Sequence, residues 1–259
     1  MNIQRISNNQ NYSNNLQKQT NFKAWRKVVL DPNKVHLVGD KPKHMNNTAF
    51  FRYGSMWEKF IKFITEKYKD TTKVNVYNYG CSDGSEPLSL AMILKSKYGE
   101  IAHKFLPIIA KDYDEVAIDK ALSREYTVGH FEKGDINKFT NNEFSRYFTK
   151  EKRLDSTHEL CLLKPELYED VKFSIANILD DCKNIKKENS FVMARNFWPY
   201  LSDEDKVKLA FKLSRTLKKN CTLMIGEFDL ENRWSTLNLS TLLKQAKFKP
   251  TDNPMFFEK

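Results

Sequence analysis

Glycines and an acid lie close together in the run YGCSDGSEP at residues 79–87, between a predicted strand and a predicted helix. Gly80 and Gly84 permit tight turning and let a ligand approach the backbone closely, and Pro87 suits the first turn of a helix. The run is neither a GxGxxG dinucleotide motif nor a P-loop. Because Glu86 at the helix entrance would repel a phosphate, the run favours a cationic or hydroxyl-bearing ligand such as S-adenosylmethionine. The glycines alone are equally consistent with an ordinary strand–helix loop.

A second acid, Asp112, follows the apolar run at residues 105–110. At the carboxyl end of a strand, a carboxylate can accept both hydroxyls of a ribose. The alternative is a helix cap, because Asp112 and Asp114 both precede the helix predicted to begin at Glu115. Together, the glycine turn and this acid favour an adenosine ligand without phosphates.

Two further segments carry polar and aromatic residues. The run ARNFWPY at residues 194–200 ends another predicted strand. Packing in the hydrophobic core can explain its Phe and Trp residues, but it explains Asn196 and Tyr200 less well. The run NNTAFFR at residues 46–52 precedes the sheet and reads by itself as a capped helix start.

Hydrophobic spacing predicts the elements that position these residues. Apolar residues from Met56 to Tyr68 recur at helical spacing, and Ser202 caps a later helix with an expected buried stripe of Val207, Ala210, Leu213 and Leu217. Further helices are predicted over residues 86–97 and 115–124, and strands over 74–79, 105–110, 173–178, 191–194 and 222–225. This alternation predicts an α/β fold with a mostly parallel, doubly wound sheet. Such sheets bind ligands beyond the carboxyl ends of their strands.

The net charge of +10 is concentrated at the N-terminus. Of the 259 residues, the first 73 hold 14 of the 43 basic and only 5 of the 33 acidic side chains. We expect a disordered tail over residues 1–21, which contain eleven Asn or Gln, then a basic segment and lead-in helix over 22–72 that is irregular up to residue 43, and a ligand-binding domain over 73–259. A basic excess suits an acidic protein or a nucleic acid as partner, although a solvated lysine-rich surface is equally consistent with it.

Cysteine and hydropathy patterns restrict the class of protein further. The four cysteines lie far apart with no metal-ligand spacing, which predicts reduced thiols and no metal site. No window approaches the roughly 18 apolar residues of a membrane span, and no secretory signal is evident at the N-terminus. We therefore expect a cytoplasmic protein without membrane insertion.

Taken in order, the motifs resemble those of the CheR family of chemotaxis-receptor methyltransferases, which transfer a methyl group from S-adenosylmethionine to receptor glutamates. The similar runs are NNTAFFR at 46–52 (family LTAFFR), GCSDGSEPLS at 80–89 (GCSTGEEPYS), AKDYD at 110–114 (ASDID), NILD at 177–180 (NLLD) and RNFWPYL at 195–201 (RNVMIYF). The chain departs from the family in three places. Residues 83–85 are DGS in place of TGE, and residues 226–229 are GEFD in place of GHSE. Before Met45 no match is found. The resemblance implies a divergent member with the class I, Rossmann-like methyltransferase fold and a short basic N-terminal extension.

The resemblance also implies a role for each matching residue. Arg52 and Tyr200 would face the methyl acceptor as the catalytic pair. The implied cofactor contacts are Asn46, Thr48 and Arg52 at the methionine end, Gly80 in the loop, Glu86 near the cationic centre, Asp112 at the ribose, Asn177 and Ile178 around the adenine, and Asn196 with Phe197 closing the pocket.

The implied reaction is O-methylation of a protein glutamate, possible without a general base because that carboxylate is ionised at neutral pH. The implied cofactor is S-adenosylmethionine with no metal, and the implied partner is an acidic protein such as a chemoreceptor helix. One alternative is a nucleic-acid methyltransferase acting on adenine N6 or RNA, since residues 196–200 loosely resemble the Asn-Pro-Pro-Tyr motif with one residue too many. Another is a cofactor-binding regulator that no longer transfers methyl groups.

Overall fold

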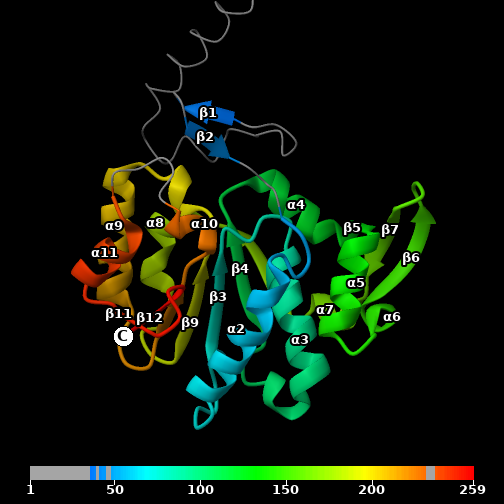
Figure 1. Cartoon of the computed structure of the whole chain (residues 1–259), viewed down its shortest axis with the longest axis horizontal. Coiled ribbons are helices and arrows are strands. Elements are labelled where there is room, and N and C mark those ends of the chain that lie inside the picture. The colour runs from blue at the N-terminus through cyan, green and yellow to red at the C-terminus, as the bar shows by residue number, and fades with distance from the viewer. Residues whose placement is uncertain (1–35, 39–40, 45–47, 232–236) are drawn as a thin grey trace, which may run out of the picture.

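The computed structural model describes residues 36–38, 41–44, 48–231 and 237–259, and its centre is a seven-stranded sheet (Figure 1). The strand order is β11-β12-β10-β9-β3-β4-β8. All neighbours from β10 to β8 are parallel, and β12 is antiparallel to both β10 and β11. The bounds are β3 Asn75–Tyr79, β4 Ile108–Asp112, β8 Val171–Ile175, β9 Ser190–Ala194, β10 Thr222–Met224, β11 Lys249–Pro250 and β12 Phe256–Glu258. The predicted mostly parallel α/β sheet is confirmed.

The strand order reverses beside β3. From β3 the chain adds β4 and β8 on one side, and then crosses to place β9 and β10 on the other. Ligands of such sheets bind at the carboxyl ends of the strands where this reversal occurs. The loop that follows β3 is the glycine-containing run at residues 80–84, so the topology and the sequence motif indicate the same place.

Helices cover both faces of the sheet. Successive side chains of a strand point to opposite faces, and those of β3 join two different hydrophobic clusters. Val76 joins the cluster formed by α2 (Gly54–Lys67) and α3 (Ser85–Ala102), whereas Tyr77 and Tyr79 join the cluster of α8 (Ile178–Asp181), α9 (Asp203–Thr216) and α11 (Leu239–Gln245). The fold is therefore doubly wound, as predicted. Within the described part of the chain, no helix has the length and apolar character needed to cross a membrane.

Two strands begin and end differently from the prediction. The strand expected over residues 105–110 begins at Ile108, directly after Pro107, which has no N–H to donate to the ladder. The strand expected over residues 173–178 ends at Ile175, because Asn177 instead caps α8, its side-chain oxygen accepting a hydrogen bond from the N–H of Leu179 at 2.9 Å.

Helix α9 corrects the expected buried stripe. Val207 is 36% exposed, whereas Lys206 and Leu209 are buried beside Ala210 and Leu213. The helical spacing from residue 206 turns Val207 outward. Lys206 buries its aliphatic stem while its ammonium group reaches Asp203 at 3.0 Å.

A three-stranded antiparallel sheet, which the sequence analysis did not predict, is formed by the part of the chain that connects α4 (Glu115–Ser123) to β8. It lies at the right of Figure 1. Its order is β5-β7-β6. The elements of this region are β5 Glu125–Gly129, α5 His130–Phe139, α6 Phe144–Tyr147, β6 Phe148–Arg153, β7 His158–Leu163 and α7 Pro165–Tyr168. The small sheet packs on the main domain through Tyr126 and Phe148, whose rings both contact the ring of Phe50.

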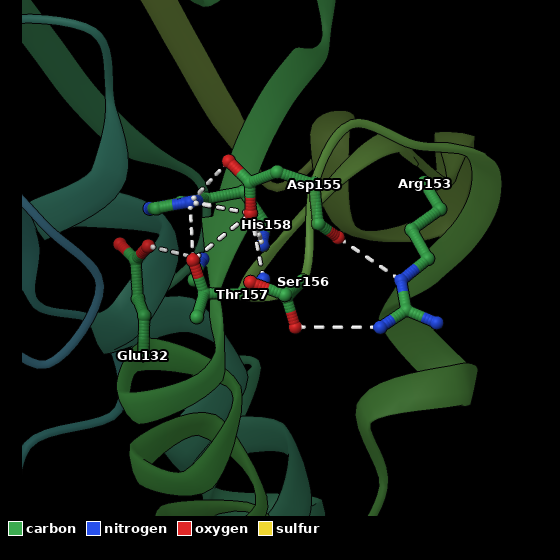
Figure 2. Close-up of polar contacts among 7 residues, drawn as sticks. Glu132, Arg153, Asp155, Ser156, Thr157 and His158 are labelled. Carbon is green, nitrogen blue, oxygen red and sulfur yellow. Dashed lines mark hydrogen bonds and ion pairs between the residues drawn. The ribbon is translucent and has the colours of Figure 1, made fainter.

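The turn between β6 and β7 is held by its own side chains (Figure 2). The Asp155 carboxylate accepts hydrogen bonds from the N–H groups of Thr157 at 2.6 Å and His158 at 2.8 Å, and these bonds lower the pKa of Asp155. Arg153 donates to the carbonyl oxygens of Asp155 and Ser156. Because these contacts are local, they explain the shape of the hairpin and require no catalytic role.

A short hairpin of β1 (His36–Val38) and β2 (Lys41–His44) corrects the expectation of irregular structure up to residue 43. Strand β2 lies next to the 3-10 turn η3 (Trp198–Tyr200). The tail predicted over residues 1–21 lies outside the described residues.

Candidate cofactor and acceptor site

The loop after β3 turns sharply and packs closely against the loop after β9. Gly80 and Gly84 have φ values of +73° and +89°, in the left-handed region that favours glycine. A Cβ atom on Gly80 would come within 2.9 Å of the Phe197 ring. The glycines are therefore required by the loop conformation and by this approach.

We expect Gly80→Ala to weaken cofactor binding by about tenfold, because the left-handed backbone costs about 1–2 kcal/mol with a side chain and Phe197 must move. Calorimetric titration with S-adenosylmethionine measures this. Gly134→Ala is the matched control, since a Cβ there meets no atom within 4 Å. Equal affinity of the Gly80→Ala variant and the unmodified protein would contradict the role of this close approach.

Asp112 lies at the end of β4 and turns back onto the glycine loop. Its two carboxylate oxygens accept hydrogen bonds from the N–H groups of Ser82 at 2.8 Å and Asp114 at 3.0 Å. Burial outweighs these bonds and raises the pKa of Asp112 to about 6. Asp114, not Asp112, caps α4 by accepting from the N–H of Val116. Each Asp112 oxygen retains acceptor capacity, so the carboxylate fits the predicted ribose contact.

Glu86 joins a buried polar cluster beneath the loop. Its carboxylate accepts a hydrogen bond from the Asn78 amide at 2.7 Å and pairs with Arg195 at 2.5 Å. Within the described ranges, Asn78 Oδ1, Arg195 Nε and Asn196 Oδ1 are buried without a hydrogen-bond partner. Two of these atoms are acceptors, as an ammonium group requires, and buried polar atoms are normally paired. The cluster therefore fits the amino-acid end of S-adenosylmethionine.

The segment before α2 is anchored by its two phenylalanines. Phe50 and Phe51 are buried, and their N–H groups donate to the Glu132 carboxylate at 2.7 Å and to Ser89 Oγ at 2.9 Å. These bonds tie the segment to α5 and α3 and leave Thr48 and Arg52 half-buried on either side. Asn46, the remaining predicted contact here, lies outside the described residues.

Arg52 and Tyr200 come from distant parts of the sequence, and the charge of Arg52 is near enough to act on the Tyr200 hydroxyl. Burial raises the pKa of Tyr200, while the nearby positive charge of Arg52 opposes that rise. The Arg52 guanidinium also donates a hydrogen bond to the Tyr53 hydroxyl at 3.1 Å. The neighbouring loop adds the Phe228 ring, whose centroid is 6.1 Å from that of Tyr200. The pair predicted to face the acceptor therefore shares one neighbourhood.

The loop after β8 completes the arrangement. The Ala176 N–H donates to the Asp112 carbonyl oxygen at 2.8 Å, so Asn177 and Ile178 follow directly beside the acid. Ile178 is buried and Asn177 is half-buried. Both positions are consistent with the predicted contacts to an adenine.

The comparison with known families tests the resemblance directly. The family model described as "CheR methyltransferase, SAM binding domain" matches residues 46–237, which is most of the chain. This chain belongs to the CheR family. The matched segment runs from the anchored phenylalanines to the loop after β10 and so contains every element of the site described above.

Curated relatives of this CheR domain are chemotaxis methyltransferases. Chemotaxis protein methyltransferase 2 of Vibrio cholerae is 22% identical over 198 residues, covering 74% of this chain and 65% of that protein. The chemotaxis protein methyltransferase of Borreliella burgdorferi is 24% identical over 189 residues, covering 70% of this chain and 63% of that protein. The chain thus spans less than two thirds of the length of these relatives.

Two solved methyltransferase structures are weakly similar to this CheR domain. Magnesium protoporphyrin IX methyltransferase from Synechocystis, with bound SAH, is 11% identical with a TM-score of 0.43, covering 92% of this chain and 90% of that one. A TehB-like SAM-dependent methyltransferase from Corynebacterium glutamicum is 9% identical with a TM-score of 0.39, covering 80% of this chain and 96% of that one. Neither similarity bears on the substrate.

Several residues of this CheR domain were missed by sequence reasoning. Tyr113 follows Asp112, and its pKa is raised by burial and by the nearby Asp112, Asp114 and Tyr200. Asn78 is a fully buried polar residue between the aromatic residues Tyr77 and Tyr79 of β3, and a polar residue at that place in a strand is the signal that could have revealed it. The four cysteines are free and buried. Among the residues placed by the structure, no group of three or more His, Cys, Asp or Glu could hold a metal ion.

Proposed function

We propose that this chain is a methyltransferase that uses S-adenosylmethionine to O-methylate a glutamate carboxylate on an acidic protein, with a chemoreceptor helix as the candidate acceptor. Family membership supports the cofactor and the general reaction. The observation that carries the acceptor chemistry is the proximity of Arg52 and Tyr200, since a guanidinium and a phenol are suited to orienting a carboxylate. A cytoplasmic location is part of the proposal.

The residues of this chain would contribute mainly by positioning. S-adenosylmethionine, when bound, supplies an activated methyl group. Asp112 and the glycine loop would hold its ribose end, and the cluster around Glu86 would hold its amino-acid end. The acceptor carboxylate needs no base because it is already ionised near neutral pH. Arg52 would fix one edge of the carboxylate, and the Tyr200 hydroxyl, kept protonated by its raised pKa, would donate a hydrogen bond to it.

Two exposed lysines of α2 are candidates for contacting an acidic partner, in a groove whose lining holds three lysines and three acidic residues. A groove of about 790 Å³ runs along α2, which begins two residues after Arg52. Lys59 and Lys62 line the groove on exposed positions of α2, and Glu227 of α10 also lines it. The full lining is Ser55, Met56, Lys59, Lys62, Phe63, Glu66, Lys67, Glu227, Leu230, Asp252, Asn253, Pro254 and Met255.

Reversing two of these charges tests the proposed partner. We expect Lys59→Glu/Lys62→Glu to raise KM for an acidic acceptor about tenfold at low salt, because rim charges steer association, and to matter less at high salt. The dissociation constant of S-adenosylmethionine should stay unchanged. The control is Lys244→Glu/Lys249→Glu, at exposed positions outside the groove. If both double variants raise KM equally, the groove has no specific role.

Product chemistry distinguishes the proposed function from its alternatives. The protein is incubated with methyl-labelled S-adenosylmethionine and a cell lysate, and the labelled products are treated with mild base. Label on protein that leaves as methanol supports a carboxyl ester. Base-stable label on RNA or DNA would support a nucleic-acid methyltransferase, and cofactor binding without transfer would support a regulator.

A further inference from the structure

Asp229 is a buried carboxylate that the proposed mechanism does not use. It lies in α10 (Glu227–Leu230) after β10, is 4% exposed, and binds three backbone N–H groups. Its Oδ2 accepts from Asn196 and from Gly226, both at 2.7 Å, and its Oδ1 accepts from Trp198 at 3.2 Å. One side chain therefore joins the loop after β10 to the loop after β9.

The three bonds hold a backbone that is otherwise unfavourable. Asn196 has a φ of +61°, which most residues avoid. Its side-chain oxygen would lie 2.0 Å from a Cβ on Gly226, so the two loops touch without room for a methyl group. Because the bonds of Asp229 fall on either side of Phe197, they fix the position from which Phe197 reaches Gly80.

The same bonds affect the acceptor side of the site. Trp198 begins the 3-10 turn that ends at Tyr200, and the Tyr200 N–H donates to the Phe197 carbonyl oxygen at 3.0 Å. Phe228, which precedes Asp229, places its ring beside Tyr200. The negative charge of Asp229 also contributes to the raised pKa of Tyr200. One carboxylate therefore influences both a predicted cofactor contact and the predicted acceptor contact.

We propose that Asp229 is a positioning residue for methyl transfer, which holds Phe197 against the cofactor loop and Tyr200 toward the acceptor in a single arrangement. This inference rests on the proposed methyltransferase function. Burial raises the pKa of Asp229 to about 7, while the three N–H donors and Arg195 favour its charged form. An uncharged amide cannot replace this contact, because its NH₂ group would face an N–H donor.

The test compares Asp229→Asn with Asp229→Glu and with Asp119→Asn, an exposed position on α4. We expect Asp229→Asn to lower kcat about 100-fold, as misplacement of about 1 Å can do, and to weaken S-adenosylmethionine binding by about tenfold or less in calorimetry. The tryptophan fluorescence of the ligand-free protein, to which Trp198 contributes, should also change. Asp229→Glu restores the charge and should recover much of kcat, and Asp119→Asn should match the unmodified protein.

Two results would overturn the inference while leaving the proposed function intact. The first is an Asp229→Asn variant with normal kcat at a temperature well below its melting point, which would mean that the carboxylate only adds stability. The second is Asp229→Glu with no recovery of kcat despite a normal melting temperature. Absence of transfer by the unmodified protein, with cofactor binding intact, would instead refute the proposed function.

Discussion

Replacing Asp112 with asparagine is expected to weaken S-adenosylmethionine binding about 10- to 100-fold near pH 7.5, the loss typical of a hydrogen bond to a charged group. The carboxylate lies at the end of β4, and each of its oxygens accepts one backbone N–H while keeping capacity for a ligand hydroxyl. Calorimetry gives the dissociation constant, and circular dichroism confirms that the variant is folded. The matched control is Asp114→Asn, because asparagine caps a helix about as well as aspartate does.

The pH dependence of binding follows from the raised pKa of Asp112. That pKa is about 6 because burial disfavours the charged carboxylate, so the group takes up a proton as the pH falls through this value. If the ligand requires the carboxylate, its dissociation constant should rise by about tenfold per pH unit below about 6 and level off above it. Asp112→Asn should lack this rise. An unchanged profile in that variant would show that another group titrates.

The second large effect is expected at the acceptor pair. Tyr200→Phe or Arg52→Ala should slow methyl transfer by about 100- to 1,000-fold, the usual loss when one donor to reacting oxygens is removed. Cofactor affinity should change little in Tyr200→Phe, because Tyr200 is predicted to face the acceptor. It should fall by about tenfold or less in Arg52→Ala, because Arg52 is also a predicted contact of the methionine end. Turnover and calorimetry measured on the same preparations separate the two effects.

The control for the acceptor pair is Tyr98→Phe, since Tyr98 lies near the C-terminal end of α3, whose opposite end follows the glycine loop of the site. It should retain full turnover. Equal losses of turnover and cofactor affinity in Tyr200→Phe and Arg52→Ala would refute an acceptor-facing role for the pair. Such a result would favour a purely structural role for the two side chains.

The predictable parts of the site are those whose signal is local in the sequence. Gly80 and Gly84 adopt the positive φ values that their residue type favours, and Asp112 follows an apolar strand as ribose-binding acids do. Asn177 is close to Asp112 because both follow adjacent parallel strands. The roles of Asn46, Thr48, Glu86, Asn196 and the other implied cofactor contacts stay predictions.

The parts that sequence reasoning missed depend on tertiary contacts. Five of the six residues of β6 are exposed and polar, so the strand lacks the alternation that indicates a half-buried sheet. Asp229 reads as an ordinary acid near a helix start, and only the approach of two distant loops gives it three N–H partners. Lys206 is buried, although a lysine side chain is expected to be exposed.

The placement of β3 between β4 and β9 has a consequence for stability. Strand β4 follows β3 directly in the chain, whereas β9 arrives only after the small sheet and β8. A molecule bound to the loops after these strands would link early and late segments of the polypeptide through non-covalent contacts. Ligand at about 100 times its dissociation constant adds about 2.7 kcal/mol to the free energy of unfolding. Occupancy by S-adenosylmethionine would thereby couple the unfolding of the two segments.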